Sequence, residues 1–303
     1  MRSSVRRAAQ VLAAVVAVGA VAAGCGSGPS QVGSAMIVGD RSVAIGDMQS
    51  RIDTALGHKA QLAAQSSQDI ADADVSRYVV GREVMHELLT AAATREGIAI
   101  PDQAVDAALA DQGTQSLQLD RSLYEGAALR DRVRDRLIAI ALAGKYIDHL
   151  AVTVDLASAT SQQDAEAKAR TIAAGGPAAQ KILSDAATAQ AGMRYRAGQD
   201  PESATTVLFG TPAGQTVAFQ PSPGQGVWLV LHVVERSTTA PLDGPPAAGT
   251  VDQDTLAAIG ERLTQPDSAS VKVNPRFGEW DPIAQQVVPA GKAAGTILGA
   301  SAG

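Results

Sequence analysis

Histidines, carboxylates and a single cysteine are the residues through which this chain could do chemistry. His86-Glu87-Leu88-Leu89-Thr90 lacks the second histidine of the HExxH zinc motif, and one imidazole cannot hold zinc alone. His58, His149 and His232 are isolated, so we interpret all four histidines as surface or structural groups. The sequence contains no GxSxG or GxxxxGK[ST] motif, which are the signatures of a serine nucleophile and a phosphate loop. The sequence therefore predicts no metal site, no cofactor and no assigned catalytic residue.

The cysteine stands at the end of an N-terminal segment that has the features of a bacterial export signal. Arg2, Arg6 and Arg7 precede an apolar run of 13 residues, 11–23, and a bilayer span needs about 20. The following Ala22-Ala23-Gly24-Cys25 resembles a lipobox, in which the cysteine becomes the acylated first residue. We therefore expect a signal peptide over 1–24 and lipidation at Cys25. An ordinary secretory signal with a chance cysteine is the alternative.

A short segment rich in Gly, Ser and Pro follows the cysteine, so residues 25–34 are predicted to be a flexible lipidated tether. The resemblance to a lipobox implies a protein on the extracytoplasmic face of the cell membrane. Acyl chains would hold it there through burial of their methylene groups, at about 0.8 kcal/mol each.

The composition excludes several classes of protein. The chain has 303 residues, of which 46% are hydrophobic and 18% charged, as expected for a folded globular protein. Aromatic residues make up only 3%, so the core must consist of Ala, Val, Leu and Ile. A net charge of −6 without a basic cluster argues against a nucleic-acid partner. One cysteine rules out an intramolecular disulfide framework and a multi-cysteine zinc site.

The elements up to residue 150 are predicted to be helical after a short hairpin. Residues 35–46 have the pattern of two short strands around Gly39-Asp40. Helical periodicity then predicts a helix from about 47, a long helix over 72–96 that ends at Gly97, a helix opened by Pro101, and a helix over about 124–150. The last of these is apolar on two sides, so we expect it to lie between neighbours.

The pattern changes after residue 150 and predicts a smaller α+β domain over 151–237. The expected elements are a strand at 152–157, helices at 160–174 and 177–189, a loop at 192–203, and strands at 206–209, 215–219 and 226–235. Beyond it we expect a linker at 238–250, a helix and strand within 251–288, and a disordered tail at 289–303. The 251–288 segment is expected to return to the N-terminal helices, which expose more apolar surface than their own segment covers.

Three stretches carry a resemblance to a known family. The layout of 35–150, and above all Glu96-Gly-Ile-Ala-Ile-Pro-Asp-Gln-Ala-Val-Asp-Ala-Ala-Leu109, looks like the N-terminal domain of SurA-type periplasmic chaperones. Residues 151–237 are similar to a parvulin prolyl isomerase domain. The segment 273–281, Val-Asn-Pro-Arg-Phe-Gly-Glu-Trp-Asp, resembles a signature of actinobacterial SurA-like lipoproteins. The resemblance implies an α+β protein, mostly helical, with an inserted parvulin-like domain.

The parvulin resemblance does not carry over its catalytic residues. The first-strand histidine of active parvulins falls at Asp155, and the last-strand histidine falls at Leu229, after Trp228. His232 lies three residues further along, so in a strand it points to the opposite face from Leu229. We therefore expect a degenerate domain without isomerase chemistry.

The resemblance implies a membrane-anchored chaperone that binds unfolded or extended secreted polypeptides without catalysis. An active prolyl isomerase, with two histidines facing each other in a small pocket, is one alternative. A scaffold or adaptor lipoprotein for one dedicated partner is the other. The charges at 130–136 are interpreted as alternating-sign surface charge, or else as a polar rim around a binding groove. Trp228 and Trp280 are interpreted as core anchors rather than recognition residues. The sequence assigns no residue to polypeptide binding.

Overall fold

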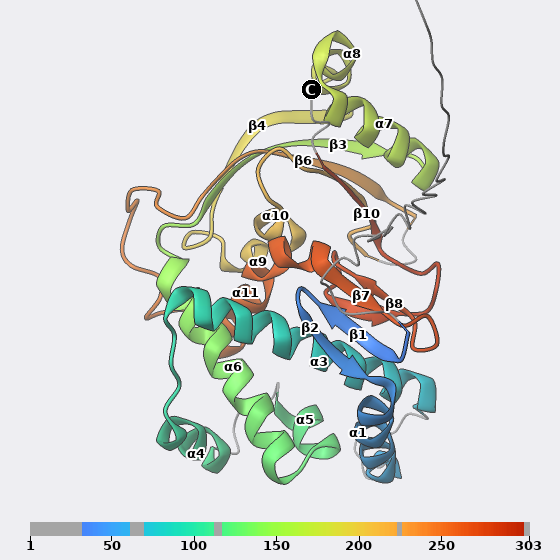
Figure 1. Cartoon of the computed structure of the whole chain (residues 1–303). Helices are drawn as coiled ribbons and strands as arrows, with labels where there is room; N and C mark the ends of the chain where they lie inside the picture. Colours follow the sequence, from blue (N-terminus) through green and yellow to red (C-terminus); the bar gives the residue numbers. More distant parts are fainter. Residues whose placement is uncertain (1–31, 61–69, 112–116, 223–225, 300–303) are drawn as a thin grey trace, which may run out of the picture.

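The computed structural model describes residues 32–60, 70–111, 117–222 and 226–299 (Figure 1). The expected signal peptide, Cys25 and nearly all of the expected tether lie outside these residues. Within the described ranges, no helix is long and apolar enough to cross a bilayer. The chain folds as an α+β protein in which a helical part carries a small hairpin and an arched sheet lies beside it (Figure 1).

The helical part follows the pattern expected from the sequence. Its elements are β1 (Ser34–Val38), β2 (Arg41–Ala44), α1 (Ile45–Gly57), α3 (Asp72–Glu96), α4 (Asp102–Ala110), α5 (Gln118–Leu123) and α6 (Gly126–Tyr146). Gly97 ends α3 with φ 66°, in the left-handed region that glycine adopts without steric cost. Met48 and Ile52 of α1 pack against the valines at 75, 79, 80 and 84 of α3 to form the core of this part. The short helix α5 was not expected.

The C-terminal segment lies against the N-terminal helices. It contains α11 (Gln253–Leu263), a 3-10 turn (Gln265–Ser270), β7 (Val271–Val273), β8 (Glu279–Asp281) and β9 (Gln286–Val288). Strand β7 pairs antiparallel with β1, which gives the sheet order β2-β1-β7. Helix α11 packs on α6, and Arg82 of α3 donates a hydrogen bond to Glu261 of α11 at 2.9 Å. The helix and the strand of 251–288 therefore contact residues more than 100 positions away.

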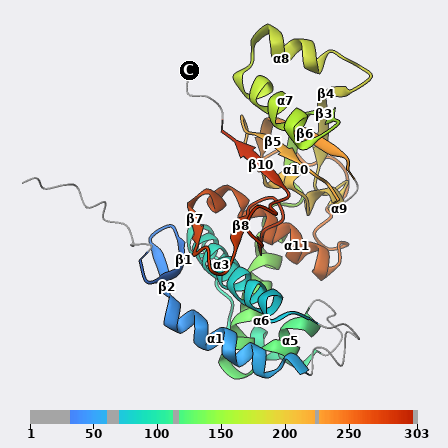
Figure 2. The same ribbon diagram turned by 90° about the vertical axis from the view of Figure 1, so that its right-hand side faces the viewer.

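The α+β part consists of one antiparallel sheet with helices on both faces. Its elements are β3 (Ala151–Ala159), α7 (Gln162–Ala174), α8 (Gly176–Leu183), β4 (Ala189–Arg196), α9 (Pro201–Ala204), α10 (Val207–Gly210), β5 (Thr216–Phe219), β6 (Trp228–Ser237) and β10 (Gly295–Leu298). The strand order is β10-β5-β6-β3-β4. Figures 1 and 2 show α7 and α8 on one side of the sheet and α9, α10 and α11 on the other.

Side-chain alternation along the strands separates two cores in this part. Val230 and Ala218 pack with Ala165 and Ala169 of α7. Leu231 and Val217 pack on the other face, in the core that includes Phe209, Ile259 and Leu263. Successive strand residues point to opposite faces. The near-continuous apolar runs of β5 and β6 therefore supply side chains to the cores on both faces of the sheet.

Two expectations for residues 192–209 are wrong. Strand β4 occupies 189–196, where a helix end and a loop were expected, and it pairs with β3 around an irregularity between Val154 and Leu156. Residues 206–209 form no strand, because Thr206 accepts a hydrogen bond from the amide of Leu208 and caps α10. Pro201 likewise starts α9 behind the capping side chain of Asp200. Local capping overrides the apolar pattern in this stretch.

The expectation of a disordered tail at 289–303 is also wrong for residues 289–299. Residues 295–298 form β10, which pairs antiparallel with the edge strand β5. The tail has few apolar residues to pack. Its backbone groups nevertheless form hydrogen bonds with β5, whose edge would otherwise be open. Amino-acid composition does not predict this kind of pairing. Residues 238–250 contain neither helix nor strand.

Candidate functional site

Helix α3 forms a wall of two hollows, one on each side of it. The first, which we call the α1–α3–α6 groove, has a volume of about 380 Å³. It is lined by Arg51, Thr54, Val79, Glu83, His86, Glu87, Tyr124, Glu125, Ala128, Asp131 and Arg132. Its lining thus contains apolar side chains together with charged side chains of both signs.

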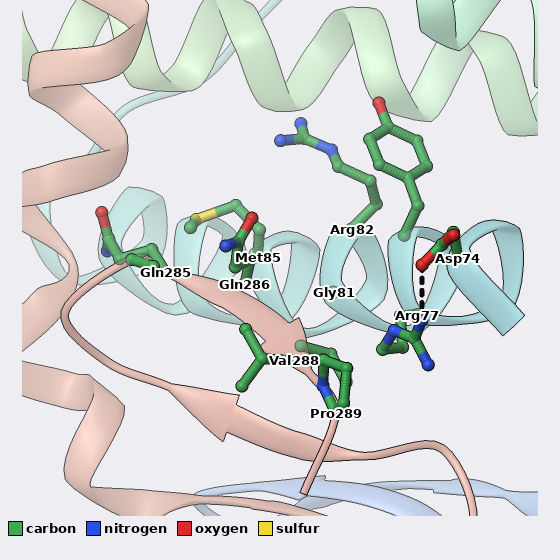
Figure 3. A pocket seen from close by; sticks show the side chains of 12 residues that line it. Asp74, Arg77, Gly81, Arg82, Met85, Gln285, Gln286, Val288 and Pro289 are labelled. Carbon is green, nitrogen blue, oxygen red and sulfur yellow. Dashed lines mark hydrogen bonds and ion pairs between the residues drawn. The ribbon is translucent and has the colours of Figure 1, made fainter. Parts of the chain in front are cut away.

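The second hollow, which we call the α3–β9 groove, has a volume of about 440 Å³. Its α3 wall consists of Asp74, Arg77, Tyr78, Gly81, Arg82 and Met85, and residues 284–289 form the opposite wall (Figure 3). A Cβ atom at Gly81 would lie 3.4 Å from the amide nitrogen of Val287, so β9 lies directly against this point of the helix. Figure 3 shows the Asp74–Arg77 ion pair on the same side of α3 as Pro289, with Arg82 turned away.

A buried ion network lies beneath the α1–α3–α6 groove. Glu83, Arg132 and Asp135 are only 6%, 5% and 1% exposed. Arg132 Nη2 lies 3.2 Å from Asp135 Oδ2 and 3.9 Å from Glu83 Oε2, and its Nη1 donates to the carbonyl oxygen of Arg82 at 2.6 Å. Arg51 of α1 pairs with Glu83. Because every buried charge has an opposite charge beside it, the network can exist inside a folded protein.

His86 extends this network to the surface of the groove. Its Nδ1 lies 2.7 Å from Asp135 Oδ1, and 30% of its side chain is exposed. The hydrogen bond to Asp135, together with the negative charge of that carboxylate, raises the pKa of His86 above 6.5 despite its partial burial. Protonation of His86 is therefore favoured in the folded state.

A second polar contact joins α3 to α5 and involves Tyr78, which lines the α3–β9 groove. Tyr78 donates a hydrogen bond to Asp120 Oδ1 at 2.8 Å. Burial and the negative charge of Asp120 raise the pKa of Tyr78 well above its ordinary value. Asp120 is itself 4% exposed, so this contact links α5 to the helical core. Tyr124, which follows α5, lines the α1–α3–α6 groove.

The interpretation of residues 130–136 as surface charge is wrong for half of them. Arg132, Asp135 and Arg136 are buried, and Arg136 pairs with Asp254 of α11 at 2.7 Å. The remaining charges, Arg130, Asp131 and Arg134, are partly exposed and pair with one another or with α4, and Asp131 also lines the α1–α3–α6 groove. The inner three are spaced by three and four residues, which is the signal that would have placed them on one helix face.

The two positions carried over from the parvulin resemblance do not face each other. Asp155 pairs across the sheet with His232, whereas Leu229 pairs with Ser158. Cross-strand partners share a face and alternate along the strand, so Asp155 and Leu229 lie on opposite faces. Asp155 accepts a hydrogen bond from the amide of Gly192 at 2.7 Å, and His232 Nδ1 lies 2.9 Å from Thr216 Oγ1.

The histidines of the chain all lie within the described residues, and no hydrogen bond or ion pair there joins two of them. His86 contacts Asp135, His149 contacts the carbonyl oxygen of Ala240 at 2.9 Å, and His232 contacts Thr216. Over residues 32–60, 70–111, 117–222 and 226–299, no cluster of three or more His, Cys, Asp and Glu side chains could hold a metal ion.

The tryptophans contribute to packing. Trp228 packs on the α7 side of the sheet. Trp280 of β8 packs against two cores, one formed largely by α1 and α3 and the other by α3, α6 and α11. Both tryptophans are partly exposed.

Comparison with known proteins finds a family match for the N-terminal part of the chain. The family model of the SurA-like N-terminal domain matches residues 1–135, a range that ends at Asp135 and includes all lining residues of the α1–α3–α6 groove. No curated protein gives a significant match to the chain. Residues 1–135 therefore resemble SurA-like N-terminal domains, and this match supports a SurA-like, chaperone-type family for the chain.

Proposed function

We propose that this protein is a membrane-anchored extracytoplasmic chaperone that binds unfolded or extended secreted polypeptides without catalysis. The observation that carries the proposal is the pair of grooves on α3, a helix within the residues that match the SurA-like N-terminal domain. Their volumes of about 380 and 440 Å³ lie in the range of ligand-binding pockets.

The lining of the grooves suits an extended chain of mixed sequence. Met85, Val287 and Val288 line the α3–β9 groove with apolar side chains that are 2%, 6% and 8% exposed, and burial of a client side chain against apolar surface is worth about 25 cal/mol per Å². Val79 and Tyr124 do the same in the α1–α3–α6 groove. Charges of both signs lie around these side chains, and several of them are paired, such as Asp74 with Arg77 and Arg51 with Glu83.

A crosslinking pulldown with the chain that starts at Gly26 separates this proposal from its rivals. A chaperone yields many secreted proteins in substoichiometric amounts, whereas a scaffold or adaptor yields one dominant partner in stoichiometric amount. A single partner across several growth conditions would contradict the chaperone proposal.

Membrane anchoring through Cys25 is part of the proposal. It is supported by the run Ala22-Ala23-Gly24-Cys25 after a short apolar segment. Mass spectrometry of the mature N-terminus is expected to find an acylated Cys25, and Cys25→Ala is expected to release the chain or leave it uncleaved. An unmodified N-terminus downstream of Cys25 would refute this part of the proposal.

The parvulin-like block is proposed to have lost isomerase activity. Strand β3 leads into α7, and β6 is the last strand of the block, in keeping with the resemblance. Asp155 and Leu229 lie on opposite faces of the sheet, so they cannot act together on one proline. A proline-peptide assay is expected to show only the uncatalysed rate, which reflects a barrier of about 18–20 kcal/mol. A faster rate that is lost on changing Asp155 or His232 would overturn this expectation.

A further inference from the structure

Strand β10 covers an edge of the five-stranded sheet that is otherwise open. Its residues pair with β5 in the register Gly295↔Phe219, Thr296↔Ala218, Ile297↔Val217 and Leu298↔Thr216. Thr216, Val217 and Ala218 have no solvent-exposed surface in this arrangement. If β10 left, their backbone groups would form a row of unpaired donors and acceptors, which is a template for another strand.

The side chains of β10 contribute little to holding it in place. Thr296 is exposed, and Ile297 and Leu298 are only partly buried. Ile297 contacts the core below the sheet, and Leu298 contacts the core beside α7. Strand β10 is thus held by four residues, of which two apolar side chains are only partly buried.

The segment before β10 is fixed independently of it. Glu279 Oε1 accepts hydrogen bonds from the amides of Gly291 and Ala293 at 3.0 and 3.3 Å. The buried Asp281 accepts one from the amide of Ala294 at 2.6 Å. The chain is therefore anchored up to Ala294, and β10 can leave without disturbing these contacts.

We propose that the β5 edge is a binding site for an extended polypeptide strand from another chain, and that β10 occupies this site in the free protein. The edge selects for a small residue at the first position, because a Cβ atom at Gly295 would lie 2.0 Å from the carbonyl oxygen of Ala218 and 2.7 Å from the Cα of Phe219. The second position is open to solvent, and the third and fourth are apolar. The site goes beyond the proposed function, because it lies on the sheet and not in the grooves of α3.

A peptide-binding experiment tests the site directly. Fluorescein-labelled peptide of residues 293–299, Ala-Ala-Gly-Thr-Ile-Leu-Gly, is titrated by anisotropy with the full chain and with a chain that ends at Ala294. The truncated chain is expected to bind at least tenfold more tightly. The Gly295→Val peptide is expected to lose at least tenfold in affinity, whereas the matched Thr296→Val peptide should bind as well as the original. Equal affinity of both chains, or unchanged binding of the Gly295→Val peptide, would overturn the proposal.

A second variant keeps the test decisive if the truncated chain fails to fold. The full chain carrying Gly295→Val is expected to gain at least tenfold in affinity for the original peptide and to exchange the amides of 216–219 faster. No gain in peptide affinity would overturn the proposal. Neither experiment uses an unfolded client protein. A negative result for the β5 edge would therefore not contradict the chaperone proposal, and a negative result for the chaperone proposal would not contradict binding at the β5 edge.

Discussion

Gly260 of α11 is the position at which the packing of the C-terminal segment on the N-terminal helices can be tested most sharply. A Cβ atom built on Gly260 would lie 1.9 Å from the carbonyl oxygen of Ala139 in α6, and 2.4 Å from its carbonyl carbon. Real Cβ atoms almost never come within 3.0 Å of such atoms. Gly260→Ala therefore forces the two helices apart by about 1 Å, with Ile259 and Leu263 carried along.

Two opposing effects set the size of the change. Overpacking of a well-packed core costs about 1–3 kcal/mol, and here the obstacle is backbone, which cannot rotate away. Replacing glycine by alanine within a helix returns about 0.5–1 kcal/mol through helix propensity. We expect Gly260→Ala to lower the free energy of unfolding by about 1–2 kcal/mol.

Urea denaturation followed by circular dichroism measures this effect, with Gly144→Ala as the matched control. Gly144 lies in α6, is exposed, and has nothing within 4 Å of its Cβ position. The control variant is therefore expected to gain stability through the same helix propensity. If Gly260→Ala proved as stable as Gly144→Ala, α11 would not pack on α6 as described.

Three further predictions concern two buried arginines and the partly buried His86. Arg132→Ala leaves Glu83 and Asp135 without their shared cation and is expected to cost about 3–5 kcal/mol in urea denaturation; a loss below 1 kcal/mol would contradict the network. The raised pKa of His86 means that its stabilising effect is complete below pH 6.5 and is lost as the pH rises through the raised value. The stability difference between the wild type and His86→Gln should therefore shrink as the pH rises from 6.5 through the raised pKa of His86, and a constant difference would refute the role of the Asp135 hydrogen bond. Burial lowers the pKa of Arg262 to about 10, and its guanidinium donates to Thr205 O, Gln265 Oε1 and Ile283 O. Arg262→Lys cannot reach all three acceptors and is expected to lower the melting temperature, with a loss of about 2 kcal/mol; an unchanged melting temperature would contradict this.

The elements that the sequence predicts best are those specified by local patterns. The bounds of α3 follow from helical periodicity and from Gly97, and the hairpin follows from Gly39-Asp40. Strands β4 and β10 were not predicted, because their partners are 30 to 80 residues away in the sequence and pairing there depends on an available edge. Backbone hydrogen bonding to an existing sheet leaves no signature in side-chain composition.

The candidate grooves could not be located from the sequence. The α3–β9 groove joins residues 74–85 to residues 284–289, which no local pattern brings together. The buried ions were missed for a similar reason: Arg51, Glu83 and Arg132 lie on three different helices, and charged residues are buried only where such partners meet.

Site-specific photocrosslinking tests most directly whether the grooves of α3 bind unfolded polypeptide. A benzophenone amino acid replaces Glu87 in the α1–α3–α6 groove, Gln286 in the α3–β9 groove, or the exposed Lys181 of α8 as a control. Each variant of the chain starting at Gly26 is irradiated with a reduced and alkylated model protein that cannot fold. Crosslinks from Glu87 or Gln286, absent at Lys181 and suppressed by excess unlabelled client, are the predicted result. Equal crosslinking at all three positions, or none at the two groove positions, would contradict it.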